Sequence, residues 1–147
     1  MMLMAALLVG CGESSDNQAE NSDSQEKEQK LSEFEMEHGI GPVDEKITIG
    51  EIDAELAKEG MRIFDMKCSS CHKMEGRYVG PPLGGITEVR TPAYIMNMIL
   101  NPEEMIEKHP IPKALYEEYL TRMTYQNVSR EEARAIVEYL ASEDRAE

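Results

Sequence analysis

Two cysteines and a histidine stand together in the segment Cys68-Ser69-Ser70-Cys71-His72. Two thiols with two residues between them can lie about one helical turn apart, on the same side of the chain. Such a pair, followed directly by an imidazole, suits three chemistries. It can bind zinc, it can cycle between dithiol and disulfide, or it can add to the two vinyl groups of one porphyrin and present the imidazole to the iron.

The remaining residues favour the third chemistry. A zinc site needs a second pair of ligands, and the only other histidines are His38 and His109. A thiol-redox pair usually stands beside a βαβ pattern, which the sequence lacks. Because chance alone would produce Cys-x-x-Cys-His in about one shuffled chain in a thousand, we predict one haem c, attached covalently through Cys68 and Cys71, with His72 as the proximal iron ligand.

The composition is compatible with a small domain built around such a group. The chain has 147 residues, only two Phe and no Trp, so aromatic side chains cannot supply much buried area and a large apolar cofactor would fill the gap. The net charge of -14 argues against binding to nucleic acid and against electrostatic attraction to anionic lipid. Partners are expected to be proteins.

The N-terminus has the character of a targeting segment. Residues 1–10 are apolar but too few to span a bilayer, and Leu8-Val9-Gly10-Cys11 resembles the lipobox of bacterial lipoproteins. No Lys or Arg precedes the apolar run, and an incidental cysteine is the alternative. We predict a signal peptide over residues 1–11 that ends at a lipidated Cys11.

A strongly acidic stretch follows. Residues 12–46 hold eleven Asp and Glu but only three Lys, among many Ser, Asn and Gln. This composition cannot bury enough apolar surface to fold, which predicts a disordered tether in which Leu31, Phe34 and Met36 are scattered apolar residues. The predicted domain is residues 47–147.

Within that domain, helix start signals recur and no segment alternates with a period of two. The sequence predicts an all-α fold of about four to five short helices around one haem, with a loop over residues 76–85. The predicted helices begin after Asp53, Thr91, Asn101 and Pro112 and after the capping box that starts at Ser129.

The order of these features resembles that of the class I cytochrome c family over about residues 52–142. A helix with Gly and Phe leads into Cys-x-x-Cys-His, and a Gly-Pro-x-Leu loop, short helices, a loop Met and a terminal helix with an aromatic residue follow. In this sequence the matching residues are Gly60, Phe64, Cys68, Cys71, His72, Gly80, Pro81, Leu83, Met123 and Tyr139.

The resemblance implies roles for three of these residues. The carbonyl of Pro81 would accept a hydrogen bond from His72, and Gly60 would let the first and last helices approach closely. Met123 would be the second axial ligand of the iron, although Thr124 stands where the family often has Pro.

Other residues remain open as the sixth ligand. The sequence contains eleven Met, of which most are expected in the core or the signal peptide. Met105 and His109 are the principal alternatives to Met123.

The resemblance implies a one-electron carrier rather than an enzyme, because a protein that fills both axial positions has no place for a small-molecule substrate. The expected partners are redox proteins such as a terminal oxidase or a denitrification reductase. The expected location is the periplasmic or cell-surface side of a bacterial membrane, where the lipid on Cys11 would anchor the chain. The alternatives are a sensor or enzyme subunit with an open or His-ligated sixth site, and a protein that carries haem only for stability.

Overall fold

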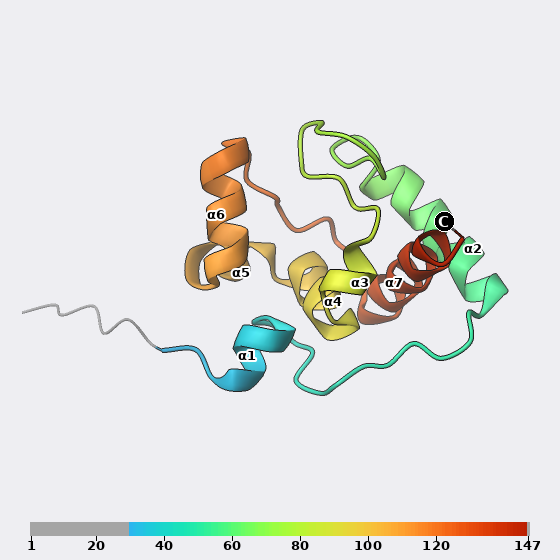
Figure 1. The fold of residues 1–147 in the computed structure, drawn as a ribbon, viewed down its shortest axis with the longest axis horizontal. Coiled ribbons are helices and arrows are strands. Elements are labelled where there is room, and N and C mark those ends of the chain that lie inside the picture. The colour runs from blue at the N-terminus through green and yellow to red at the C-terminus, as the bar shows by residue number, and fades with distance from the viewer. Residues whose placement is uncertain (1–29, 147) are drawn as a thin grey trace, which may run out of the picture.

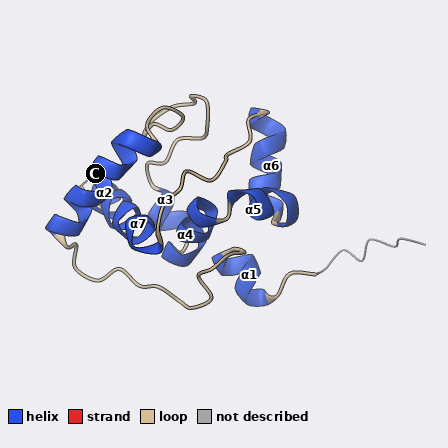
Figure 2. Cartoon of the chain, turned by 180° about the vertical axis from the view of Figure 1, so that it is seen from behind, coloured by secondary structure: helices blue, strands red, loops and turns tan. Residues whose placement is uncertain are grey.

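The computed structural model describes residues 30–146, and all regular structure in this part of the chain is helical (Figure 1 and Figure 2). The all-α prediction is confirmed, although the described residues form more helices than the four or five expected. They are α1 (Glu33–His38), α2 (Ala54–Lys67), α3 (Ile86–Val89), α4 (Pro92–Leu100), α5 (Pro102–Lys108), α6 (Pro110–Tyr119) and α7 (Arg130–Asp144). Within residues 30–146, no helix combines the length and the apolar character that a membrane span requires.

Helices α2 and α7 lie side by side (Figure 1), and α4 packs on α7. Buried side chains from all three helices form the main core. Local capping residues explain where α2 and α7 begin. The side chain of Asp53 accepts the N–H groups of Glu55 and Leu56 at 3.0 and 3.1 Å, and Ser129 forms a reciprocal capping box with Glu132. Each cap supplies acceptors for N–H groups that a helix start leaves without intrahelical partners, as the sequence predicted.

The contact between α2 and α7 depends on Gly60. A Cβ atom at this position would collide with the main-chain oxygen of Ala135 and lie 2.9 Å from Cβ of Tyr139. One turn further along α2, Phe64 packs against Tyr139 with ring centroids 5.5 Å apart. The close approach that the family resemblance implied is therefore present.

The middle helices follow their start signals with one exception. Thr91 caps α4 and Pro92 occupies its first turn, as predicted. The fourth predicted helix was expected to begin at Lys113, after Pro110 and Pro112, but α6 begins at Pro110. That start was wrong because the first-turn N–H groups have no intrahelical acceptor, so proline loses nothing there.

The prediction of a disordered tether is wrong for residues 30–46. This segment contains α1, which begins with a capping box between Ser32 and Glu35, and it packs against the domain. Its buried residues are His38, Gly39, Ile40 and Val43. The rest of the predicted tether, the predicted signal peptide and Cys11 lie outside the described residues.

Hydrogen bonds from distant residues hold this segment. The buried amide of Asn97 accepts the N–H of Val43 at 2.9 Å and donates to the carbonyl groups of Val43 and His38 at 2.9 and 3.0 Å. The sulfur of Met105 accepts the N–H of Ile40 at 3.0 Å. We call residues 30–50 the N-terminal strap; in Figure 1 the strap runs past α4 toward the start of α2.

Candidate haem site

The two cysteines lie where α2 ends. Cys68 is the C-cap of α2, and its N–H donates to the carbonyl of Phe64 at 2.8 Å. The N–H groups of Cys71 and His72 both donate to the carbonyl of Cys68, at 3.0 and 2.9 Å. This additional turn leaves Cys68 half-buried and Cys71 exposed, and the two cysteines are not joined by a disulfide.

The environment of Cys68 differs from that of a thiol-redox catalyst. Burial raises the pKa of the Cys68 thiol to about 11, and the charge of Lys67 offsets only part of this effect. Reactive cysteines in redox catalysts need the opposite, a lowered pKa that yields a thiolate at neutral pH. The described residues also contain no cluster of three or more His, Cys, Asp or Glu that could hold zinc.

A carbonyl group and a glycine orient the ring of His72. Its Nδ1 lies 2.9 Å from the carbonyl oxygen of Pro81, and because a carbonyl only accepts, Nδ1 carries the proton. A Cβ atom at Gly80 would lie 2.6 Å from Cε1 of His72, so only glycine lets the loop approach the ring this closely. The other nitrogen, Nε2, is then unprotonated and can ligate a metal ion.

A cavity of about 440 Å³ opens beside this histidine. All five residues that we predicted to hold the cofactor line it: Cys68, Cys71, His72, Pro81 and Met123. The volume lies within the usual range for cofactor sites, and most of the lining side chains are apolar. These side chains come from α2 to α7 and the loops between them.

The charged residues of the lining are all basic. Lys67, Arg90 and Arg122 contribute to the cavity, but no Asp or Glu does, although the chain carries a net charge of -14. An apolar macrocycle with acidic substituents matches this combination of surface and charge. The residues present therefore fit a haem, whose propionates are its acidic groups.

Two methionines contribute to the cavity. Met123 lies in the segment between α6 and α7 and is half-buried, whereas Met98 comes from α4. Met96, on the same helix as Met98, is buried in the core instead. The cavity lining thus narrows the candidate thioether ligands to Met123 and Met98.

The two alternative ligands from the sequence lie elsewhere. Neither Met105 nor His109 contributes to the cavity lining. The sulfur of Met105 accepts the N–H of Ile40, as described above. Both ring nitrogens of His109 have hydrogen-bond partners, at Met36 and Ile111.

Sequence reasoning missed one wall of the cavity. Ile111, Leu115 and Tyr119 of α6 all line it. Their spacing of four residues places them on one face of a helix, and this apolar stripe was visible in the sequence. The signal was lost because we expected the helix to begin at Lys113.

Basic side chains near the cysteines are engaged with the protein. The ammonium group of Lys67 donates to the carbonyls of Gln126 and Asn127, both at 3.1 Å, and so connects α2 to the segment that carries Met123. Arg77 pairs with Glu118 at 2.7 Å and its guanidinium lies over the ring of Tyr119. The contacts of Arg77 thus connect the loop after His72 to α6.

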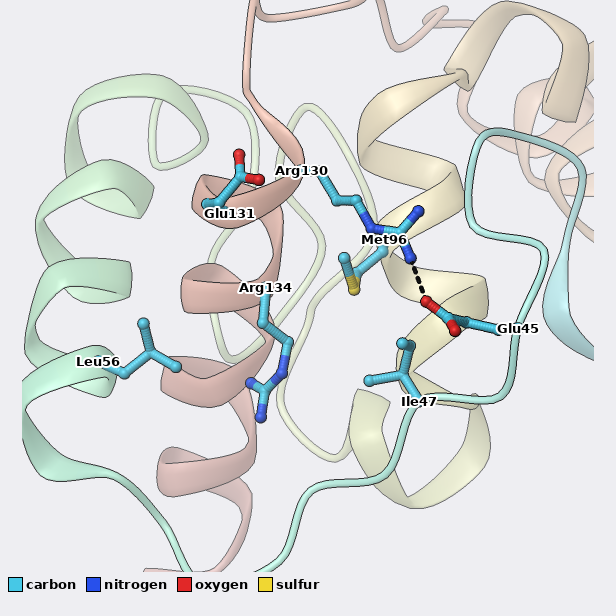
Figure 3. Close-up of a pocket in the computed structure, with 7 residues that line it drawn as sticks. All are labelled: Glu45, Ile47, Leu56, Met96, Arg130, Glu131 and Arg134. Atoms are coloured by element: carbon cyan, nitrogen blue, oxygen red, sulfur yellow. Dashed lines mark hydrogen bonds and ion pairs between the residues drawn. The ribbon is translucent and has the colours of Figure 1, made fainter.

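A second cleft, of about 430 Å³, lies between the N-terminal strap and α7 (Figure 3). It is lined by Glu45, Ile47, Leu56, Met96, Arg130, Glu131 and Arg134. Arg130 pairs with Glu45 at 2.6 Å, as the dashed line in Figure 3 marks, and Arg134 pairs with the buried Glu138. Because the lining contains neither Cys nor His, this cleft is not a candidate haem site.

The chain is similar to known proteins over most of its length. Cytochrome c from Rhodothermus marinus has 44% sequence identity and a TM-score of 0.73, covering 77% of this chain and 97% of that chain. An engineered variant of it, described as bound to a carbene intermediate, has 43% identity and a TM-score of 0.68, covering 76% of this chain and 96% of that chain. Cytochrome c2 from Rhodopseudomonas palustris is 25% identical over 121 residues, which are 65% of this chain and 86% of that protein. The sequence model of the family "Cytochrome c" matches residues 57–144, and the chain therefore belongs to the cytochrome c family.

Proposed function

We propose that this protein is a one-electron carrier whose single haem c is bound covalently through Cys68 and Cys71 and ligated by His72 and Met123. One observation carries the proposal: His72, oriented by the carbonyl of Pro81, lines the same apolar cavity as the thioether of Met123. A haem c bound there supplies reversible one-electron chemistry. The similarity to a cytochrome c2 and to the cytochrome c of Rhodothermus marinus supports this role.

The two ligands would have different tasks. The hydrogen bond to Pro81 fixes the tautomer of His72 and makes Nε2 a better donor. The thioether of Met123 is a soft, neutral donor, which favours the reduced state of iron. With both axial positions filled by the protein, a substrate has no position to occupy, so we propose no enzymatic activity.

The alternative is a sensor or enzyme subunit with an open or His-ligated sixth site. Its His-ligated form has little support, because His72 is the only histidine that lines the cavity and His109 is engaged elsewhere. Its open form would require that neither Met123 nor Met98 ligate the iron.

We further propose that a lipid on Cys11 anchors the protein to a bacterial membrane on its periplasmic or cell-surface side. The support is the Leu8-Val9-Gly10-Cys11 motif, together with the fact that c-type haem is attached outside the cytoplasmic membrane. Its partners would be redox proteins, with a terminal oxidase or a denitrification reductase as the expected classes.

Optical spectroscopy tests the proposed ligation. The holoprotein should show a weak sulfur-to-iron absorption band near the red end of the spectrum when oxidised, and its reduced spectrum should not change when carbon monoxide is added. Binding of carbon monoxide to the reduced protein would instead support the open-site alternative.

A further inference from the structure

His109 lies outside the haem cavity, at the junction of α5 and α6, where it is the C-cap of one helix and the N-cap of the other. Its side chain is fully buried, and the ring meets that of Tyr94 edge-on with centroids 5.2 Å apart. Nε2 lies 3.2 Å from the carbonyl oxygen of Met36 in α1. The N–H of Ile111, in the first turn of α6, donates to Nδ1 over 3.3 Å.

These two contacts require a neutral ring. A carbonyl oxygen only accepts, so Nε2 must carry a proton to bond to Met36. A main-chain N–H only donates, so Nδ1 must keep its lone pair for Ile111. A second proton on the ring would sit on Nδ1 and face the N–H of Ile111, which would remove the N-cap of α6 and place a buried charge beside α1.

Helices α5 and α6 hold the segment that carries Met123. The N–H of Tyr125 donates to the carboxylate of Glu103 in α5 at 3.2 Å. Arg122, next to Met123, lies 3.7 Å from the carboxylate of Glu107 in α5, and its guanidinium stands over the ring of Tyr116 in α6 at 5.3 Å. These contacts connect both helices to the residues beside Met123.

We propose that His109 is a positioning residue for Met123: its neutral ring fastens the N-terminal strap to α6, and its protonation releases both and loosens the segment that carries the thioether. The release of α1 and α6 follows from the geometry of this ring alone. The effect on the iron ligand rests in addition on the proposed function.

The electrostatic surroundings favour the neutral ring at neutral pH. Burial lowers the pKa of His109 below its usual value, the positive charge of Arg90 acts in the same direction, and the hydrogen bond to Met36 opposes them. Burial raises the pKa of Tyr94 to about 12, so its phenol is uncharged. The charged and titratable groups on the elements around this ring are Glu33, Glu35, Glu37 and His38 in α1, Tyr94 in α4 with Arg90 just before it, Glu103, Glu104, Glu107 and Lys108 in α5, and Lys113, Tyr116, Glu117, Glu118 and Tyr119 in α6.

The sign of the pH dependence follows from this shift. The pKa of His109 is lower in the folded protein than in the unfolded chain, so the unfolded chain binds more protons as the pH falls. The stabilising effect of the neutral ring is fully present above the unfolded pKa of about 6.5 and is lost as the pH falls toward and below the folded pKa.

Two substitutions separate the two contacts. Asn is a good N-cap, so His109→Asn should keep the hydrogen bond from the N–H of Ile111. The Asn side chain is too short to reach the carbonyl of Met36, so the contact with α1 should be lost. Gln is longer and can donate toward Met36 but caps poorly, so His109→Gln should keep the contact with α1 and weaken the start of α6. Neither side chain titrates, and His38→Gln is the control for the other buried histidine.

The test is amide hydrogen exchange of the oxidised holoprotein, corrected for intrinsic rates, alongside its sulfur-to-iron band. Between about pH 7.5 and about pH 5, the protection factors of α1 and of the first turn of α6 should fall about fivefold in wild type and in His38→Gln, as expected for a lost N-cap. The sulfur-to-iron band of both proteins should weaken over the same pH range. At about pH 7.5, His109→Asn should lose protection in α1 and His109→Gln in α6, and neither should change further with pH.

Three results would overturn the proposal. The first is that protection in wild type does not change with pH, a result that is decisive even if a variant fails to fold. The second is that both His109 variants show the same acid-dependent loss of protection as wild type. The third is that His38→Gln no longer shows this acid-dependent loss. Loss of protection with an unchanged band would overturn the link to Met123. A wild-type band that is absent even at about pH 7.5 would instead count against the proposed ligation, whatever the exchange profile shows.

Discussion

Gly60 and Ala135 meet backbone to backbone where α2 crosses α7: a Cβ atom on Gly60 would collide with the main-chain oxygen of Ala135. Because a helix backbone cannot move aside as a flexible side chain can, Gly60→Ala should force the two helices apart. We expect a loss of about 1–3 kcal/mol in the free energy of unfolding, the usual cost of overpacking. Chemical denaturation of the holoprotein measures this loss.

Gly50→Ala is the matched control for this substitution. Gly50 has no atom within 4 Å of the position that its Cβ would take, so the added methyl group should fit without strain. An equal effect of both substitutions on the free energy of unfolding would contradict the crossing as the cause.

Asn97 is predicted to be the main polar support of the N-terminal strap. Asn97→Ala would leave the buried N–H and C=O groups of Val43 without the amide that pairs with them at 2.9 Å each. With about 1–3 kcal/mol for each of these two unpaired buried groups, we expect a loss of about 2–6 kcal/mol in the free energy of unfolding. Thermal or chemical denaturation is the measurement.

A nearby residue provides the comparison. Asn101 is half-buried and donates to the carbonyl of Ile40 at 3.2 Å and to Glu104 at 2.8 Å. Because water can reach this site, Asn101→Ala should cost less than Asn97→Ala. The reverse order of the two losses would be inconsistent with burial as the deciding factor.

Met123 and Met98 provide a test of the axial ligand. Both line the cavity, but we predict that only Met123→Ala abolishes the sulfur-to-iron band of the oxidised protein and lets carbon monoxide bind to the reduced protein. Met98→Ala should keep the band, since it removes only apolar contacts. A band that disappears in Met98→Ala and persists in Met123→Ala would reverse the assignment.

Much of the domain could be predicted because its signals are local. The caps at Asp53, Thr91 and Ser129 each act within one helical turn, so the sequence alone indicates where α2, α4 and α7 begin. The arrangement Cys-x-x-Cys-His is equally local, since the turn that follows α2 positions all three side chains.

The features that were missed depend on contacts between distant parts of the chain. The short helix α3 is capped by Asp144, whose carboxylate accepts the N–H groups of Gly85 and Thr87 at 2.7 and 2.9 Å. The N-terminal strap is polar in composition and owes its order to Asn97 and Met105. Period and composition carry no information about such partners, although the capping box at Ser32 was a visible local signal for α1.

The lipid anchor gives a prediction for the N-terminus of the mature chain. If Cys11 is acylated, the wild-type protein should partition into detergent, and its intact mass should correspond to a lipidated chain that begins at this residue. Cys11→Ser should be released from membranes or remain unprocessed. A wild-type product that stays in the aqueous phase would exclude the anchor.

Two nested deletions test where the folded unit begins. Deleting residues 17–29 leaves all of the described residues in place, so we predict that the free energy of unfolding and the sulfur-to-iron band are unchanged. Extending the deletion to residue 40 removes α1 together with Ile40.

The longer deletion should be costly because buried groups lose their partners. The sulfur of Met105, the amide of Asn97 and Nε2 of His109 would each lose a bond to the deleted segment. At about 0.5–1.5 kcal/mol for each of these three hydrogen bonds, we expect a loss of about 1.5–4.5 kcal/mol in the free energy of unfolding relative to the shorter deletion. Both proteins keep the cysteines and His72, so each should still carry covalent haem, which makes the comparison one of stability alone. Equal stability of the two deletions would mean that the strap contributes nothing to the folded domain, whereas destabilisation by the shorter deletion would place the start of the domain before residue 30.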